Sequence, residues 1–271
     1  MQKEKLRLLV IGAHPDDCDI LAGGTAVKYA GNGHVVKFLS ATNGDTGHYE
    51  KGGGQLSLIR AEEAANAAKT AGIEYEVLDI HNNGIEVNIQ TRERMISLIR
   101  EFKPDIVFTH RPYDYHPDHR ATSMLVQDSS YALIIPNVCP LTPTLKRMPV
   151  IMYLSDAFKK PYEFVPDVVV DIDDTFEDKV RMLDCHKSQV YEWLPWVDSE
   201  LDEVPAGDKE RIKWLGERQL KRDGRTAERF RKQLIQKYGA KRAGTIKAAE
   251  AFELCEYGRE PGENELLKLF P

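Results

Sequence analysis

Histidine and aspartate gather in two short loops of this chain, each directly after an apolar run. The first loop follows LRLLVIGA (residues 6–13) and contains His14, Asp16 and Asp17. The second lies in THRPYDYHPDHR, which begins at the end of the run DIVFTH (residues 105–110). Carboxylates packed this closely repel one another, so the first loop needs either open solvent or a cation. Two imidazoles and one carboxylate with an open position form a familiar ligand set of catalytic zinc.

The second loop supplies His116, Asp118 and His119. A divalent metal between the loops would favour ionised carboxylates and neutral imidazoles, which removes the repulsion. Such a metal lowers the pKa of water, a spare carboxylate takes the proton, and a cationic group holds the oxyanion. The loops therefore predict hydrolysis by a metal-activated water. Solvated polar loops are the alternative interpretation, because surface loops often carry His and Asp.

Apolar runs alternate with helical stretches through the first half of the chain, and strand-like runs continue into the second. Continuous apolar runs bounded by turn residues predict strands that are covered on both faces. The alternation predicts an α/β fold: a doubly wound, mostly parallel Rossmann-like sheet with helices on both faces. In the common doubly wound strand orders the first and fourth strands are neighbours, which would bring the two loops together. We predict strands at residues 6–13, 34–42, 75–80, 105–110, 150–156 and 165–172, and helices at residues 18–31, 56–72, 88–103 and 174–192.

The later part of the chain is less regular, and after Pro205 it is mostly helical and charged. We predict one catalytic domain over residues 1–200 and a helical C-terminal extension over residues 201–271 that packs on it. Residues 209–247 hold 14 Lys/Arg against 4 Asp/Glu, a net charge of +10 that leaves −16 for the remainder. Solvated helix faces are the first interpretation of this basic stretch. A contact with the acidic remainder is the second, and it favours a homo-oligomer.

Composition argues against several other classes of protein. The net charge of −6 provides no electrostatic basis for general nucleic-acid binding. The four cysteines are scattered without a CxxC pair, so neither a disulfide framework nor a thiolate zinc site is indicated. No apolar stretch approaches the ~20 residues that span a bilayer, and the first residues lack a signal-peptide pattern. The expected location is the cytoplasm.

AHPDD at residues 13–17, together with HPDH at residues 116–119, resembles the PIG-L family, also called LmbE-like. The resemblance covers roughly the first 190 residues of the chain, and the remainder looks individual. Members are zinc-dependent de-N-acetylases that act on N-acetylglucosamine conjugates. The resemblance therefore implies an amide-hydrolysing enzyme with one Zn²⁺ per chain and a small amino-sugar conjugate as substrate. Fe²⁺ and Mn²⁺ are the alternative metals, because affinity order and availability both matter.

The family pattern also implies a role for each motif residue. His14, Asp17 and His119 would be the zinc ligands. Asp16 would be the general base that activates the water. His116 would stabilise the tetrahedral oxyanion as an imidazolium. The residues alone predict a metal site with a spare carboxylate, and only the resemblance selects which aspartate is the base.

Four further residues receive secondary roles. Asp118 would orient or charge-balance a neighbouring histidine, as carboxylates around metal sites do. Arg60 would face the substrate, with an ordinary surface charge as the alternative. His186, in CHKSQ at residues 185–189, would either approach the pocket or make a structural hydrogen bond. Tyr115 would contact the tetrahedral intermediate or pack against its loop.

Three other functions compete with deacetylation. A non-haem iron oxygenase also uses two histidines and one carboxylate, but it would leave Asp16 without a role. A non-catalytic metal- or carbohydrate-binding protein on the same fold is the second. A dinucleotide-binding domain is the weakest, because the first turn reads GAHPDD and lacks GxGxxG. Cys18 stands where many family members have Glu, and we expect its thiol to point away from the metal.

Overall fold

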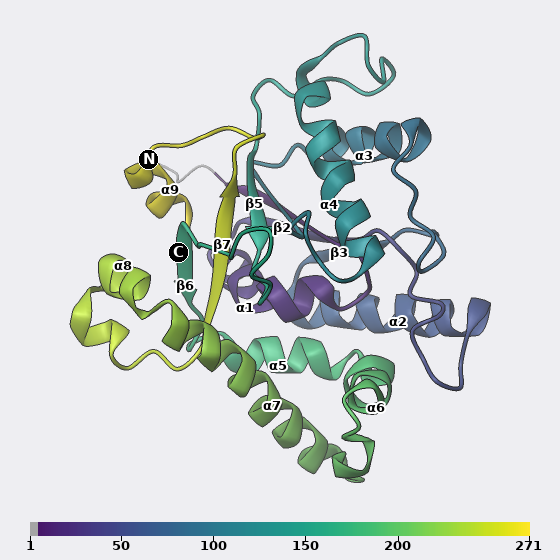
Figure 1. Ribbon diagram of the computed structural model, residues 1–271, viewed down its shortest axis with the longest axis vertical. Coiled ribbons are helices and arrows are strands. Elements are labelled where there is room, and N and C mark those ends of the chain that lie inside the picture. Colours follow the sequence, from purple (N-terminus) through teal and green to yellow (C-terminus); the bar gives the residue numbers. More distant parts are fainter. Residues whose placement is uncertain (1–4) are drawn as a thin grey trace.

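The computed structural model describes residues 5–271. Within them, a seven-stranded sheet runs in the order β3-β2-β1-β4-β5-β7-β6 (Figure 1). The five strands from β3 to β5 are parallel, and β7 lies antiparallel between β5 and β6. This arrangement confirms the predicted α/β sheet. The strands are β1 (Arg7–Gly12), β2 (Val35–Ser40), β3 (Glu74–Val77), β4 (Ile106–Thr109), β5 (Val150–Leu154), β6 (Val168–Asp171) and β7 (Ala249–Cys255).

Helices cover both faces of the sheet. Along β1, Leu8 and Val10 pack in one core with α1, α2, α5 and α9, while Leu9 and Ile11 pack in the other with α3 and α4. Successive side chains of a strand point to opposite faces, so one continuous apolar run serves both cores. The helices are α1 (Asp17–Gly31), α2 (Gly53–Ala71), α3 (Ile89–Phe102), α4 (Pro117–Ser130), α5 (Phe176–Asp184), α6 (Leu194–Val197), α7 (Asp208–Arg229), α8 (Arg231–Ala243) and α9 (Glu263–Leu269).

Local signals mark where the early helices begin and end, at the positions that the sequence predicts. Asn88 caps α3: its side chain accepts a hydrogen bond from the Thr91 backbone N–H at 3.0 Å, and Thr91 Oγ1 accepts one from the Asn88 N–H at 3.2 Å. Gly72 follows α2 with φ 67°, the left-handed conformation in which glycine is favoured. Helix α4 is absent from the predicted elements; it begins directly after His116, so the HPDH motif is a helix start.

The C-terminal region, residues 201–271, is not wholly helical. Strand β7 enters the sheet between β5 and β6, with Ile151 opposite Cys255 and Val168 opposite Phe252. The prediction of a helical extension missed this strand, because its pairing partners lie far away in the sequence. A boundary at residue 200 stays a prediction, but the region contributes a strand to the central sheet.

Helix α7 packs across α5 and β7 on the lower side of the molecule in Figure 1. A buried cluster of charges holds it there. Lys179 Nζ lies 2.9 Å from Asp223 Oδ2 and 2.8 Å from Glu250 Oε1. Glu250 also accepts hydrogen bonds from the backbone N–H groups of Gly24 and Thr25, at 2.9 and 2.8 Å. The cluster therefore joins α1, α5, α7 and β7.

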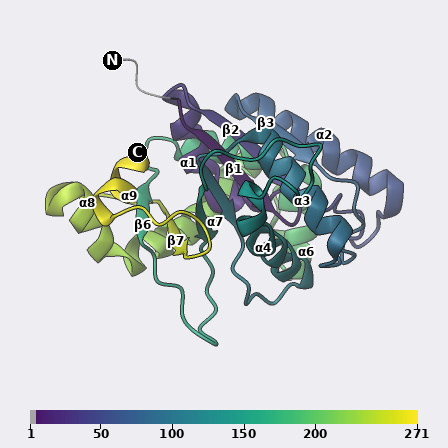
Figure 2. The same ribbon diagram turned by 90° about the horizontal axis from the view of Figure 1, so that it is seen from above.

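The remaining C-terminal elements lie at one end of the sheet. Helices α8 and α9 flank β6, at the end of the molecule opposite α2 (Figure 2). A separate small core links α7 and α8 to β6 and β7 through residues such as Phe230, Leu234 and Val169. None of the helices within the described part of the chain combines the length and apolar character needed to cross a membrane.

Candidate functional site

The two histidine-bearing loops meet at one edge of the sheet. Strands β1 and β4 pair in parallel, with Ile11 opposite Thr109, so their carboxyl ends lie side by side. This neighbour relation is the one predicted for the first and fourth strands. The first loop then enters α1, and the second enters α4 through His116. His116 Nδ1 accepts a hydrogen bond from the Asp118 backbone N–H at 3.2 Å, which caps that helix.

Three donor atoms from the two loops form a nearly equilateral triangle. His14 Nδ1 lies 3.3 Å from Asp17 Oδ2 and 3.3 Å from His119 Nε2. His119 Nε2 lies 3.5 Å from Asp17 Oδ2. Ligands bound tetrahedrally to zinc at about 2.0–2.1 Å are themselves about 3.3 Å apart. The arrangement of this metal triangle, as we call these three atoms, therefore fits a single divalent metal.

Carboxylates face the outward nitrogen of each imidazole in the triangle. His14 Nε2 lies 3.2 Å from Asp118 Oδ2, and His119 Nδ1 lies 3.1 Å from Asp114 Oδ2. Asp118 is itself held by the Asn83 backbone N–H, which donates to Oδ2 at 2.7 Å. Such partners fix ring orientation and tautomer, and they leave the inward nitrogens available to a metal. Asp118 thus contacts the histidine of the other loop, and Asp114 was not among the residues singled out from the sequence.

His110 also borders the triangle. Its Nε2 lies 3.2 Å from Asp17 Oδ2, and its ring stacks on His119 with 4.0 Å between centroids. The donor atoms of Asp17, His110 and His119 form one compact group, and those of His14, His116 and His119 form another. His110 ends the fourth apolar run, and its position directly after a strand was the available sequence signal. Within the described residues, the metal triangle is therefore surrounded by two more imidazoles.

Asp16 differs from Asp17 in its hydrogen bonds and in the direction in which its pKa is shifted. Its backbone has φ 140°, a conformation rare for residues other than glycine. Its side chain is buried, and none of the described residues donates a hydrogen bond to its carboxylate. Burial and the charge of Asp17 raise the pKa of Asp16 to about 7, against the opposing effect of Arg60. Burial also acts to raise the Asp17 pKa, but His119 and His110 outweigh it and hold that pKa well below its usual range.

His14 and His116 are shifted in opposite directions. Burial lowers the pKa of His14, but hydrogen bonding to Asp118 and Asp17 outweighs burial and raises the pKa to about 10. Burial, together with positive charge at His14 and His119, lowers the pKa of His116 to about 4. A neutral His116 differs from the imidazolium that the family resemblance implies. Because Nδ1 accepts the Asp118 N–H, the neutral ring carries its proton on Nε2.

Arg60 and His186 lie outside the cavity that contains the triangle. Arg60 Nη2 donates to the Gly47 carbonyl oxygen at 2.7 Å, while its buried Nε and Nη1 have no hydrogen-bond partner. His186 is buried, with Nε2 3.3 Å from Asp19 Oδ1. Both residues interact electrostatically with Asp16. Neither side chain lines the cavity, so a contact of either with substrate stays a prediction, whereas the burial of Arg60 shows that its surface-charge alternative is wrong.

Cys18 points into the core. Its Sγ donates to the carbonyl oxygens of Val10 and Leu39, at 3.4 and 3.8 Å. Burial raises the pKa of the thiol well above its usual range. The thiolate is the form that binds metal, so Cys18 is not a ligand. This agrees with the expectation that its thiol points away from the metal.

The triangle opens into a cavity of about 670 Å³, a size common for small-molecule sites. Tyr115 lines it, with its ring centroid 5.9 Å from that of His119, and its contact with a reaction intermediate stays a prediction. Gln189 also lines it, and its buried Oε1 has no hydrogen-bond partner. Gln189 belongs to a π-helical turn, Ser188–Trp193, a feature frequent at functional sites. Trp193 completes this wall. The cavity thus offers polar and aromatic groups beside the triangle.

Known proteins match the region that carries both loops. Residues 9–130 match the family model described as PIG-L: GlcNAc-PI de-N-acetylase. The diacetylchitobiose deacetylase of Thermococcus kodakarensis is 32% identical over 203 residues, which cover 70% of this chain and 73% of that protein. The probable N-acetyl-alpha-D-glucosaminyl L-malate deacetylase 2 of Bacillus cereus is 27% identical over 220 residues, covering 77% and 93%. Among solved structures, the fold is similar to that of the 4-carboxy-2-hydroxymuconate hydratase of Pseudomonas putida KT2440, with a TM-score of 0.71 at 21% identity. The match covers 95% of this chain and 98% of that one.

Proposed function

This chain belongs to the PIG-L family, and we propose that it removes the acetyl group from an N-acetylglucosamine-containing conjugate. The metal triangle, with the unbonded Asp16 carboxylate beside it, is the observation that carries this proposal. Deacetylases among its relatives support the reaction class. A hydratase has the same fold, so the fold alone does not select the reaction, and the proposal depends on the site.

We propose His14, Asp17 and His119 as the ligands of one divalent ion, with Zn²⁺ as the metal and Fe²⁺ or Mn²⁺ as alternatives. Two imidazoles and one carboxylate that leave a position open are typical of catalytic zinc. The near-equal distances between their donor atoms support the assignment. When bound, such an ion polarises the amide carbonyl and lowers the pKa of water.

Asp16 is the proposed general base. As the water oxygen bonds to the amide carbon, the Asp16 carboxylate takes the proton that the water loses. When the C–N bond then breaks, that proton passes to the leaving nitrogen, so the products are acetate and a free amino sugar. A base is most effective when its pKa lies near the working pH, and the pKa of about 7 at Asp16 agrees with this role.

His116 is the proposed donor to the oxyanion of the tetrahedral intermediate. In the neutral ring Nδ1 accepts the Asp118 N–H, so the proton is on Nε2, and this Nε2–H can donate to the oxyanion. The side chain of Asp118 positions His14, and Asp114 positions His119. The first loop therefore contributes two of the proposed ligands, and the second contributes the third ligand and both carboxylates that orient the imidazoles.

The competing functions have less support from the site. An oxygenase would leave Asp16 without a task, and its usual scaffold is an all-β barrel rather than the observed α/β sheet. A binding protein that kept the fold has no use for a base beside the triangle. The cytoplasmic location, the homo-oligomer and the lack of nucleic-acid binding stay predictions.

Acetate release from a panel of N-acetylglucosamine conjugates tests the proposal, with the metal content of each protein measured in parallel. We expect turnover by the wild type and about a 1,000-fold loss in Asp16→Asn, which should retain its metal, because general base catalysis contributes about 10²–10⁴-fold. Asp174→Asn, an exposed aspartate outside the cavity, is the matched control and should match the wild type. Wild-type turnover in Asp16→Asn would show that another group is the base. Metal binding without turnover of any conjugate would favour the binding protein.

A further inference from the structure

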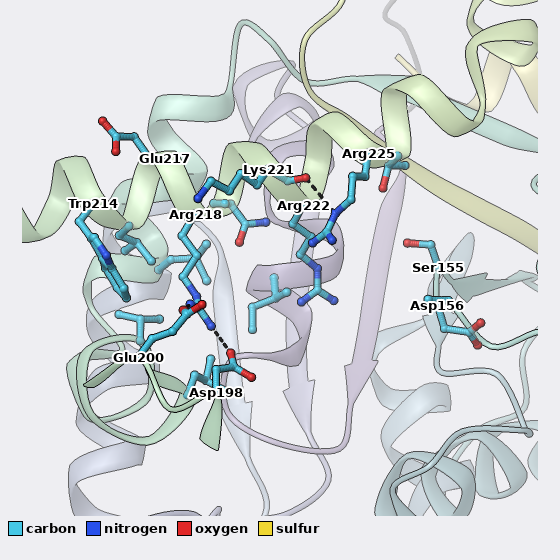
Figure 3. A pocket seen from close by; sticks show the side chains of 18 of the residues that line it. Ser155, Asp156, Asp198, Glu200, Trp214, Glu217, Arg218, Lys221, Arg222 and Arg225 are labelled. Carbon is cyan, nitrogen blue, oxygen red and sulfur yellow. Dashed lines mark hydrogen bonds and ion pairs between the residues drawn. The ribbon is translucent and has the colours of Figure 1, made fainter. Parts of the chain in front are cut away.

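The structure contains a second cavity, of about 830 Å³, and Figure 3 shows side chains that line it. We call it the α7 cavity, because α7 forms much of its wall. Ser155, Leu194 and Arg222 line both this cavity and the one that contains the metal triangle. A group attached to an amino sugar in the first cavity can therefore extend into the second.

Helix α7 turns a stripe of arginines toward this cavity. Arg218, Arg222, Arg225 and Arg229 all line it. Their spacing of four, three and four residues places them on one face of a helix. This pattern lies within the basic stretch of residues 209–247, for which solvated helix faces were the first interpretation. In the structure, part of that stretch faces a hollow that leads to the site.

The outer arginines of the stripe are neutralised by carboxylates. Arg218 pairs with Asp198 and Glu200, and Arg229 Nη2 lies 2.8 Å from Glu163 Oε1. These pairs are internal to the protein and are formed without a ligand. They account for two of the acidic side chains in the cavity wall.

The central cations of the α7 cavity have no such close partner, and Asp223, Asp17 and Asp16 act electrostatically on Arg222 only from a longer distance. Among the described residues, no carboxylate lies within ion-pair distance of Lys221, Arg222 or Arg225. Asp156, on the facing wall, is already paired with Arg111 at 2.9 Å. Figure 3 shows Arg222 projecting from α7 into the space between Asp198 and Asp156.

The other acids in the wall do not balance these cations. Glu217 Oε1 lies 3.9 Å from Lys213 Nζ, and Glu217 is next to Trp214 at the far end of the cavity in Figure 3. Glu203 is the single unpaired acid of the lining within the described residues. Three unpaired cations therefore face one unpaired acid.

We propose that this chain selects N-acetylglucosamine conjugates with an anionic aglycone, whose carboxylate or phosphate group is bound by Arg222 and Arg225. The inference rests on the proposed deacetylation and adds the class of substrate. A guanidinium offers a planar fork of donors that matches both kinds of anion. Arg222 lines both cavities, so its anion would sit next to the sugar, and Arg225, one helical turn along α7, would contact the same group from the second cavity.

Three substrates that differ in the aglycone test this selection: methyl N-acetylglucosaminide, N-acetylglucosaminyl malate and N-acetylglucosamine 1-phosphate. They are neutral, carboxylate-bearing and phosphate-bearing, so kcat/KM for acetate release also tells which anion is preferred. We expect the wild type to favour at least one anionic conjugate over the neutral one by tenfold or more. Arg222→Ala should lower kcat/KM for that conjugate by about 10- to 100-fold, since hydrogen bonds between charged groups are the strong ones.

The neutral substrate and a control variant show whether the effect of Arg222→Ala depends on the charge of the aglycone. On methyl N-acetylglucosaminide, Arg222→Ala should lower kcat/KM by much less than on the anionic conjugate, because only the longer-range effect of the Arg222 charge on Asp16 and Asp17 is lost there. Lys209→Ala removes an exposed cation of the same helix outside the cavity and should leave all three substrates unaffected. Arg222→Lys should recover only part of the loss, because an ammonium lacks the planar fork. Equal losses on neutral and anionic substrates would place Arg222 at the reaction centre and overturn the inference, as would no loss on any.

Calorimetric titration separates this inference from the proposed reaction. The three compounds are titrated into the wild type and Arg222→Ala, each in the Asp16→Asn background, in which turnover is suppressed. Weaker binding of the anionic compounds alone after Arg222→Ala would support the anion site even if no acetate were released by the parent enzyme. Equal affinities of both variants for the anionic compounds would overturn the site, while acetate release by the parent enzyme would still support the proposed function.

Discussion

The metal triangle and the α7 cavity differ in whether their charged side chains have partners inside the protein. In the loops after β1 and β4, the outward nitrogen of each ligand imidazole has a carboxylate partner within 3.2 Å. On α7, Lys221, Arg222 and Arg225 have no carboxylate within ion-pair distance among the described residues. Charges that are paired inside the protein are already oriented before substrate arrives. Charged side chains without an internal partner are free to bind a ligand of opposite charge. They can therefore select the substrate.

The two regions also differ in whether the family model covers them. The family match covers residues 9–130, which include both loops but end well before α7. The region that the family model matches carries the groups proposed for the reaction, and the arginine stripe lies after it. Our proposals therefore assign the reaction to the loops and the choice of substrate to the C-terminal region. The following variants test that division, from the largest expected effect to the smallest.

His119→Ala should abolish metal binding and acetate release. It removes one of three proposed ligands, so the loss of metal affinity should exceed the roughly 100-fold that follows removal of an orienting carboxylate. His116→Ala is the matched control: it should keep the metal and lose activity. Metal analysis after dialysis distinguishes the two. If His116→Ala lost the metal and His119→Ala kept it, the ligand set would include His116 and the triangle would be wrong.

Lys179→Met should reduce the free energy of unfolding by about 3–5 kcal/mol, because it leaves Asp223 and Glu250 buried without their cation. Methionine retains most of the aliphatic chain, so the effect reports on charge rather than on volume. Lys213→Met, an exposed lysine on α7, should stay within about 0.5 kcal/mol of wild type. Urea denaturation measures both. A change below about 1 kcal/mol in Lys179→Met would mean that the buried cluster does not fasten α7 to the sheet.

Asp118→Asn should weaken metal affinity by about 10- to 100-fold, because His14 loses the carboxylate that faces its Nε2. Asp128→Asn is a control on the same helix, at an exposed aspartate far from the triangle. Competition with a chelator of known affinity gives both values. Equal affinities for the two variants would show that the contact between Asp118 and His14 does not support the metal.

The smallest expected effect is the coupling free energy between Asp118→Asn and Arg222→Ala in the double variant. If reaction and selection are separate, the two changes in activation free energy on an anionic conjugate should add to within about 0.5 kcal/mol. The kcat/KM values of the wild type, both single variants and the double variant form the cycle. A coupling above about 1 kcal/mol would show that the two regions act as one unit and would contradict the division.

Much of the fold follows from local sequence patterns, while the choice of ligands follows from the resemblance of the two motifs to a known family. The continuous apolar runs at residues 6–13 and 105–110 predict buried strands, and both are present as β1 and β4. Their parallel pairing follows from the strand–helix alternation and the usual doubly wound order. Asn88 and Gly72 mark helix ends through hydrogen bonding and backbone conformation that the residue types themselves favour. These signals act over a few residues, so a single sequence reveals them.

The partners of the site residues depend on tertiary structure. Asp118 faces His14, which is 104 residues away along the chain, and Asp114 was not singled out from the sequence. Strand β7 was missed because its partners β5 and β6 lie about 80 or more residues earlier. The spacing of the α7 arginines is visible in the sequence, but the cavity that they face is not. Sequence alone determined the metal-binding residue types of the two loops and the basic stretch that contains the arginine stripe. Only the folded chain decided which charges are paired and which are free, because pairing depends on distances of a few ångströms between distant segments.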